Sequence, residues 1–215
     1  MSELAMRLIL GLLLVVALAL PAAAHPHVWV SVRSEIIYAP GGSMTGVRHS
    51  WTFDKAYSAY SVQGLDKNGD GKVTTDELAE LAKVNTESLN EYGYFTHARV
   101  NGKELEFAEP ADTAMEFTDG QLTLRFLLPL KKPLPASRAL MFDVSDPTYF
   151  VDFNLADGAD PVRLAGAPAG CTLTVMRPKA PAPDARNLSE SFFTALDQSS
   201  DFGTQFANKA LVACP

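Results

Sequence analysis

The sequence predicts an α+β protein: a mostly antiparallel β-sheet or sandwich with a helical insert of the EF-hand type and a short C-terminal helix. Three observations support this prediction. Apolar and polar residues alternate over much of the chain, as they do in half-buried strands. The pairs Asn101-Gly102 and Asp119-Gly120 are typical of tight hairpins. At about residues 54–93, between the first alternating segments and the first of these pairs, the spacing of apolar residues becomes helical.

The first half of the chain is expected to form two strands and then the insert. "HVWVSVRSEIIYA" alternates and is rich in β-branched residues, "PGGS" makes a turn, and "MTGVRHSWTF" returns as a second strand. Residues 74–92 are rich in helix formers. Apolar residues are expected to line an entering and an exiting helix of the insert: Tyr57, Tyr60 and Leu65, then Leu78, Leu81 and Val84.

The second half returns to strands. Both turn positions of a two-residue hairpin need positive φ, which Asn-Gly and Asp-Gly adopt at low cost. Residues 178–186 are rich in Pro and Ala and read as an extended linker, and "NLSESFFTALDQ" reads as a short helix. The expected strands are 94–100, 103–107, 113–117, 121–130, 138–146, 148–156, 171–178 and 208–215.

A leader for export is expected at residues 1–24, followed by one β-rich domain at residues 25–215. Arg7 precedes the apolar run "LILGLLLVVALAL", which at about 13 residues is too short to span a bilayer. Cleavage after Ala24 leaves His25 with the free amine. No later segment is long and apolar enough to cross a membrane. These features predict a periplasmic protein.

The charge balance excludes one large class of partner. The chain has 18 Lys and Arg against 25 Asp and Glu, a net charge of −7. Nucleic-acid binding needs a basic surface that neutralises phosphates, and the sequence offers no basic stripe. The acidity is compatible with cation binding.

The two cysteines, Cys171 and Cys214, are expected to form a disulfide, because an even pair in an exported chain is usually oxidised. The alternatives are a soft-metal pair and two free thiols.

The most specific chemical motif is "DKNGDGKVTTDE", residues 66–77, which fits the twelve-residue EF-hand loop. Gly71 stands at the position of the sharp turn, and Val73 at the apolar position that packs inward. The alternative is an Asx-rich turn that opens a helix, capped by Thr75 or Asp76, with no ion. The expected ligands of Ca²⁺ are Asp66, Asn68, Asp70, Lys72 through its backbone carbonyl, Thr74 and Glu77.

The four histidines, His25, His27, His49 and His97, are candidate ligands of a transition metal. On an extended strand His25 and His27 project to the same face. His49 and His97 belong to two further expected strands, and their rings converge only if those strands are neighbours. Pro26 lacks an amide proton, which excludes the square-planar site that uses the backbone nitrogens of an Xaa-Xaa-His terminus. The alternative is that strand histidines are hydrogen-bonded polar residues.

Several stretches together resemble one bacterial family of unknown function, described as the periplasmic component of uncharacterised ABC-type transport systems. They are "HPHVWV", "WTFDKAYS", "LDKNGDGKVTTDEL", "DPTYFVDF", "GAPAGCTLTV" and "DFGTQFANKALVACP". Members of this family look to be encoded beside nickel/cobalt transporters, which implies an accessory or metal-binding role. By the same resemblance, His25 and His27 match the family's starting motif, and Cys171 and Cys214 match its paired cysteines. Its acidic loop is matched by Asp66, Asn68, Asp70 and Glu77.

These expectations converge on a non-enzymatic periplasmic protein. Calcium would stabilise its insert, and its histidines would present Ni²⁺, Co²⁺, Zn²⁺ or Cu²⁺ to a membrane metal transporter. One alternative is a secreted oxidoreductase with a copper brace, in which the amine and ring of His25 join His97 or His49. Another is a calcium-stabilised structural or interaction module without a transition metal.

Overall fold

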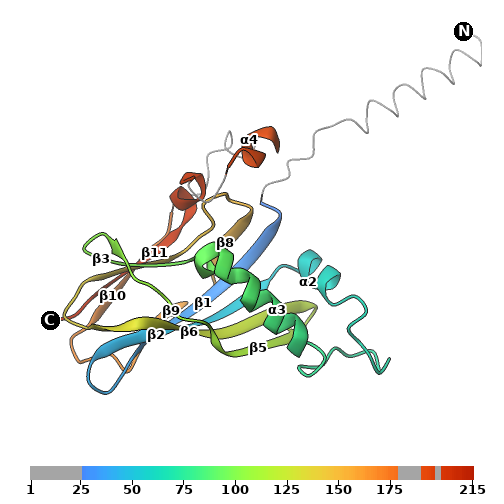
Figure 1. The fold of residues 1–215 in the computed structure, drawn as a ribbon, viewed down its shortest axis with the longest axis horizontal. Helices are drawn as coiled ribbons and strands as arrows, with labels where there is room; N and C mark the ends of the chain where they lie inside the picture. The colour runs from blue at the N-terminus through green and yellow to red at the C-terminus, as the bar shows by residue number, and fades with distance from the viewer. Residues whose placement is uncertain (1–25, 179–189, 197–199) are drawn as a thin grey trace, which may run out of the picture.

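The computed structural model describes residues 26–178, 190–196 and 200–215, which form two β-sheets with helices at one side and one end (Figure 1). The predicted leader and His25 lie outside these residues, as do most of the predicted linker and part of the predicted C-terminal helix. The α+β class and the sandwich of mostly antiparallel sheets are confirmed.

The larger sheet has the strand order β5-β6-β2-β1-β8, and β9 also pairs with β1. The β1–β2, β2–β6 and β5–β6 pairs are antiparallel, whereas β8 and β9 run parallel to β1. The chain reaches β8 from a strand of the smaller sheet, Leu140–Val144, and not through a hairpin from a neighbouring strand of its own sheet. The strands are β1 Val28–Tyr38, β2 Ser43–Phe53, β5 Ala111–Thr118, β6 Gln121–Pro135, β8 Val151–Leu155 and β9 Val162–Ala165.

The smaller sheet has the order β10-β11-β7-β3-β4, and all of its pairs are antiparallel. The disulfide between Cys171 and Cys214 is confirmed and joins the start of β10 to the end of β11. The strands are β3 Thr96–Val100, β4 Lys103–Glu104, β7 Leu140–Val144, β10 Thr172–Met176 and β11 Asn208–Ala213.

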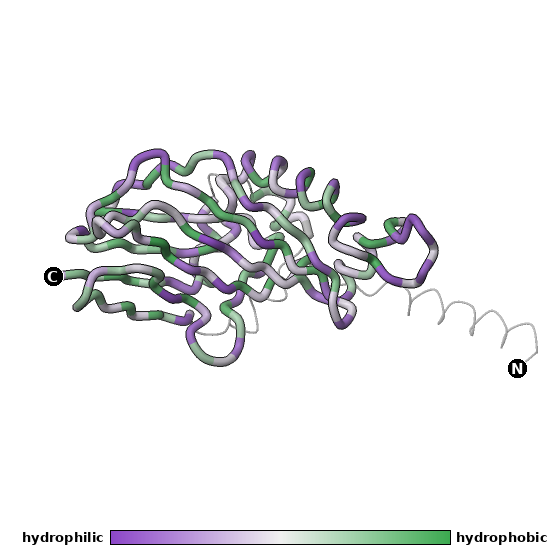
Figure 2. The backbone as a smooth tube through the Cα atoms, turned by 90° about the horizontal axis from the view of Figure 1, so that it is seen from below, coloured by the Kyte–Doolittle hydropathy of each residue, from purple (hydrophilic) through white to green (hydrophobic). Residues whose placement is uncertain are grey.

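The core lies between the sheets because each strand turns alternate residues inward, and Figure 2 shows hydrophobic and hydrophilic residues alternating along the strands. Trp51 and Phe126 from the larger sheet meet Phe142 from the smaller one, and all three are almost completely buried. Both predicted hairpins are present: Asn101-Gly102 joins β3 to β4, and Asp119-Gly120 joins β5 to β6, with positive φ at all four residues.

The insert contains two short helices that lie beside the larger sheet (Figure 1). Asp54 caps the first, accepting hydrogen bonds from Ala56 and Tyr57. The expected apolar faces of the two helices are wrong at two positions: Tyr60 of the first helix is 75% exposed, and Val84 of the second is 47% exposed. Leu65 lies beyond the end of the first helix, and Leu78 just before the second. The helices are α2 Lys55–Ser61, α3 Ala79–Leu89, the 3₁₀ helix η1 Asn90–Phe95, α4 Glu190–Thr194 and the 3₁₀ helix η3 Phe202–Phe206.

Within the described part of the chain, no helix has the length and apolarity needed to cross a membrane.

Candidate functional site

The loop between α2 and α3 is organised by hydrogen bonds from its own amides. Asp66 accepts three of them: its Oδ1 from the N–H groups of Gly69 (2.8 Å) and Asp70 (3.1 Å), and its Oδ2 from that of Gly71 (2.9 Å). Gly69 and Gly71 have φ of 72° and 81°, which side-chain-bearing residues adopt at a cost. The loop therefore winds around the carboxylate of its first residue.

The last residue of the loop closes this arrangement. Oε2 of Glu77 accepts hydrogen bonds from N–H and Oγ1–H of Thr74, both at 2.9 Å, and Oε1 accepts one from Lys67 N–H, also at 2.9 Å. These bonds favour the ionised carboxylate and lower the pKa of Glu77, the Thr74 amide contributing most. Glu77 is thus held as an anion that is hydrogen-bonded both to the start of the loop, at Lys67, and to Thr74 near its end.

The remaining predicted ligands lie in the same loop. Asn68 Oδ1 accepts from the Asp70 amide at 3.0 Å, and Asp70 Oδ1 accepts from the Lys72 amide at 2.8 Å. All the side-chain atoms of this set that could bind a metal are oxygens, the ligand type that Ca²⁺ prefers. The described residues contain no group of three or more His, Cys, Asp or Glu side chains placed to hold a metal ion. The donor set fits calcium, and binding would require the carboxylates to draw closer together.

Both ends of the loop are anchored in the fold. Leu78 follows Glu77 directly and is completely buried, and Leu65 and Val73 pack against the core. On α2, Ser58 Oγ donates to the Asp54 carbonyl (2.6 Å) and accepts from the Leu122 amide of β6 (2.9 Å). The loop is therefore fixed at both ends to helices that pack on the larger sheet.

His49 lies in the core between the two sheets. It is 1% exposed, and its ring lies 5.0 Å from that of Phe126 and 6.1 Å from that of Phe142, centroid to centroid. Burial lowers the pKa of His49 to about 3, so the ring is neutral at physiological pH.

The hydrogen bonds of His49 define its tautomer. Thr96 Oγ1 donates its single proton to the Tyr94 carbonyl (2.8 Å), so at its 3.2 Å contact with His49 it accepts from Nε2–H. Nδ1 must then accept the Ser34 hydroxyl proton, at 3.0 Å. Both ring nitrogens are used, so this arrangement leaves neither one for a metal.

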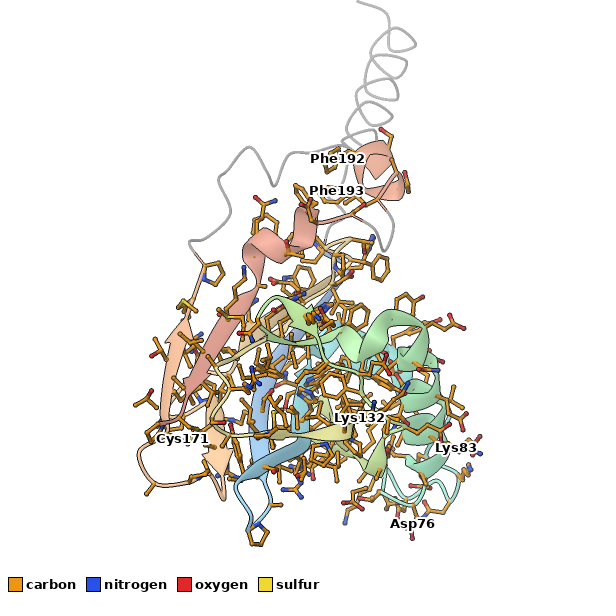
Figure 3. The ribbon with its side chains drawn as sticks, turned by 60° about the vertical axis from the view of Figure 1, so that its left-hand side comes forward. Asp76, Lys83, Lys132, Cys171, Phe192 and Phe193 are labelled. Atoms are coloured by element: carbon orange, nitrogen blue, oxygen red, sulfur yellow. A yellow bond between two sulfur atoms is a disulfide. The ribbon has the colours of Figure 1, made fainter. Side chains whose placement is uncertain are left out.

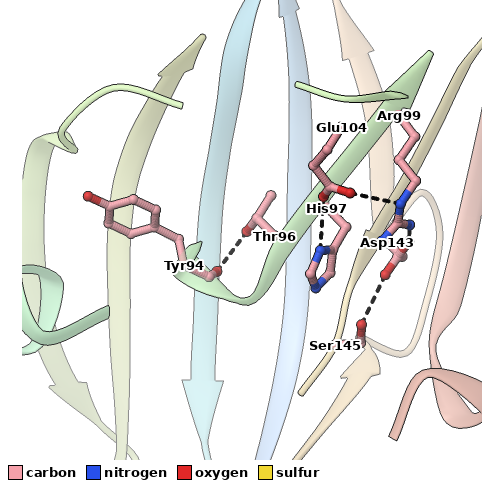
Figure 4. A network of polar contacts seen from close by, with 7 residues as sticks. All are labelled: Tyr94, Thr96, His97, Arg99, Glu104, Asp143 and Ser145. Atoms are coloured by element: carbon pink, nitrogen blue, oxygen red, sulfur yellow. Dashed lines mark hydrogen bonds and ion pairs between the residues drawn. The ribbon is translucent and has the colours of Figure 1, made fainter. Parts of the chain in front are cut away.

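His97 belongs to a polar network on the opposite face of the smaller sheet (Figure 4). Its Nδ1–H donates to Glu104 Oε1 at 3.0 Å, and Arg99 joins Glu104 Oε2 to Asp143 Oδ1, both at 2.9 Å. Ser145 completes the network by donating to Asp143 at 2.9 Å. The Nε2 of His97 is buried without a hydrogen-bond partner, an orientation that suits a metal ligand, but no second and third ligand accompany it in the described structure.

His27 lies just before β1, where its exposed ring packs 4.5 Å from the ring of Phe150. The three described histidines therefore occupy three different environments: an end of the larger sheet, the core, and the outer face of the smaller sheet. His25, the fourth, lies outside the described residues.

A cavity of about 570 Å³ lies between the insert and the inner face of the larger sheet. Trp51 of β2, Tyr57 of α2, Leu89 of α3 and Phe95 of η1 line it, so the helices on either side of the acidic loop form part of its wall. The sequence did not reveal this cavity, because its lining residues have the same apolar pattern as residues that fill a core.

The fold and the loop define a class: a β-sandwich protein with a helical insert, an acidic loop between the two helices of that insert, and one disulfide. A family described as "Protein of unknown function (DUF1007)" matches residues 10–214, and the chain belongs to that family. It is also similar to an uncharacterized 15.5 kDa protein in the trpE 3' region of Spirochaeta aurantia, with 38% identity over 91 residues, which are 42% of this chain. The match covers 65% of that protein, less than two thirds of its length.

Proposed function

We propose that the protein is an exported, non-enzymatic, calcium-binding component that serves a nickel/cobalt-type transport system. The observation that carries the calcium part is the loop at residues 66–77, in which Asp66, Asn68, Asp70, Thr74 and Glu77 supply oxygen donors at the EF-hand positions. The disulfide supports export, because such bonds persist in oxidising compartments such as the periplasm. The transport role rests on the resemblance of the motifs.

Calcium would act on the architecture of the insert. Extracytoplasmic EF-hand-type sites bind Ca²⁺ with dissociation constants of roughly 10⁻⁴–10⁻³ M, and one loop without a partner hand suits a structural ion better than a signal. By drawing Asp66, Asp70 and Glu77 together, the ion would tie the start of the loop, after Leu65, to its end, before Leu78. This would hold α2 and α3 in one arrangement against the sheet.

The transition-metal part of the proposal depends on the start of the mature chain. Both ring nitrogens of His49 are bound, to Ser34 and Thr96, and the free Nε2 of His97 has no second and third ligand beside it among the described residues. His25 and His27 are therefore the residues that would present Ni²⁺, Co²⁺, Zn²⁺ or Cu²⁺ to a membrane transporter. The same placement weakens the copper-brace alternative, which needs a third nitrogen from His49 or His97.

A second candidate function is a structural or partner-binding module whose only ion is calcium. The separation of His27, His49 and His97 into three environments favours it, since no described histidine cluster exists to hold a second metal.

Elemental analysis and N-terminal sequencing of the processed protein test both candidates at once. Calorimetric titration with Ca²⁺ should show one site, weakened about tenfold or more by Glu77→Gln. The matched control is Asp76→Asn, which removes an exposed carboxylate from the same loop at a position that supplies no ligand. Equal calcium affinity in both variants would refute the calcium site.

For the transition metal, His25→Ala with His27→Ala should abolish stoichiometric binding, while His97→Ala should retain it. Full affinity in the double variant would eliminate the histidine site and leave the calcium-only module.

A further inference from the structure

The cavity between the insert and the larger sheet has the dimensions of a small-ligand site. Its volume of about 570 Å³ lies within the range of roughly 300–1,000 Å³ that such sites occupy. Its walls come from four parts of the fold: strands of the larger sheet, the two helices of the insert with η1, the turn between β7 and β8, and Leu196 just after α4. Concave apolar surfaces of this kind usually have a binding role, because leaving them in contact with water is unfavourable.

The chemistry of the walls indicates what the cavity would hold. Aromatic rings line much of it, and two ring pairs are close to parallel: Phe53 with Tyr57 (4.8 Å, 27°) and Tyr92 with Phe95 (5.2 Å, 15°). Such flat surfaces favour a planar ring that stacks against them.

The cavity offers no exposed charged group to an ionic ligand. Among the described residues no lysine or arginine lines it, and the one carboxylate of the lining, Asp146, is buried and accepts hydrogen bonds from its own turn. Oδ1 of Asp146 accepts from the amide (2.9 Å) and hydroxyl (2.8 Å) of Thr148, and Oδ2 accepts from the Val151 amide (3.0 Å). Asn85, another polar lining residue, donates its side-chain amide to the Leu81 carbonyl of its own helix at 2.8 Å. The Nε1–H of Trp51 is buried without a hydrogen-bond partner in the described structure, so it offers a neutral donor to a ligand. A neutral ligand complements this lining.

We propose that this cavity binds a small, neutral, planar aromatic molecule. The site goes beyond the calcium and transition-metal roles and does not require them. Because Tyr57, Asn85 and Leu89 belong to the helices that flank the acidic loop, calcium would adjust the affinity of the cavity without creating it.

The test uses N-phenyl-1-naphthylamine, a neutral aromatic probe whose emission rises in an apolar environment, with the processed full-length protein. We expect saturable binding of one equivalent. The chain has two tryptophans, so Trp29→Phe leaves Trp51, which is 1% exposed and lines the cavity, as the single emitter. Its emission should fall with the same dissociation constant as the probe signal rises.

Two variants of α3 locate the probe. Asn85→Trp places a large side chain in the cavity and should weaken probe binding about tenfold or more, whereas Ser88→Trp makes the same addition on an exposed position of the same helix and should leave it unchanged. If Asn85→Trp fails to fold, Tyr92→Ala removes a wall residue that is already 42% exposed and should also weaken binding.

Several outcomes would overturn the proposal: binding that does not saturate, no quenching of Trp51, or equal affinity in Asn85→Trp and Ser88→Trp. Displacement of the probe by a peptide but by no small aromatic compound would assign the cavity to a protein partner instead. Repeating the titration with Glu77→Gln separates the two proposals, since probe binding in that variant supports the cavity whether or not the loop binds calcium.

Discussion

Acidification from pH 7 to pH 5 should remove about 2 kcal/mol of stability through His49 alone. The folded protein holds the pKa of this ring at about 3, whereas an unfolded histidine has a pKa of about 6.5. A lowered folded-state pKa means that the contribution of the neutral ring is fully present above the unfolded pKa. It is lost progressively as the pH falls toward the folded pKa.

The magnitude follows from the proton balance. A pH of 5 lies about 1.5 units below the pKa of the unfolded histidine, which has therefore bound a proton, whereas the folded ring is still neutral. At about 1.36 kcal/mol per unit, this difference favours the unfolded state by about 2 kcal/mol. The ring cannot gain the proton without giving up the bond that Nδ1 accepts from Ser34.

The assay is urea denaturation of the wild type and of His49→Gln at pH 7 and pH 5. Other acid-sensitive groups cancel in the comparison, so the stability advantage of the wild type should shrink by about 2 kcal/mol between the two pH values. Nitrogen NMR of the imidazole provides a second measurement, and should show a neutral ring protonated at Nε2 throughout this range.

A stability advantage that is the same at pH 5 and pH 7 would refute the reasoning, as would a His49 ring that titrates between these values. Addition of Ni²⁺ or Zn²⁺ should leave the His49 signals unchanged; their perturbation would show that this ring is available as a ligand after all.

Three further predictions concern stability. Burial raises the pKa of Asp152, so ionisation of this carboxyl destabilises the folded state as the pH rises. Asp152→Asn should therefore raise the melting temperature at pH 7. The gain should vanish in acid, where the aspartic acid is neutral like the asparagine that replaces it. Gly203→Ala would place a Cβ 1.8 Å from the Asp146 carbonyl oxygen and should cost about 3 kcal/mol or more in denaturation experiments, whereas Gly41→Ala, with no atom within 4 Å, should change little. Replacing Cys171 and Cys214 by Ser opens a loop with a sequence separation of 43 and should cost about 4 kcal/mol, and a loss below about 1 kcal/mol would contradict the chain-entropy argument.

The sequence by itself determined the features that depend on neighbouring residues. The two Asx-Gly hairpins form where positive φ is locally favoured, and the loop from Asp66 to Glu77 is organised by hydrogen bonds that each span ten residues or fewer. The pairing of the cysteines was predictable because there are two of them. These conclusions required no knowledge of how distant strands meet.

Tertiary structure decided the rest, because it depends on contacts between residues far apart in the chain. Alternation placed His49 and His97 on strands, but only the pairing of β3 with β7 and the packing of the sheets put one ring in the core and the other on the outer face. The parallel pairing of β8 with β1 likewise follows from a crossover between sheets. Phe53 and Tyr57 have the pattern of core residues, and only the assembled insert shows that they line a cavity. Local hydrogen bonds are encoded in adjacent residues, whereas cavities and burial arise where separate elements meet.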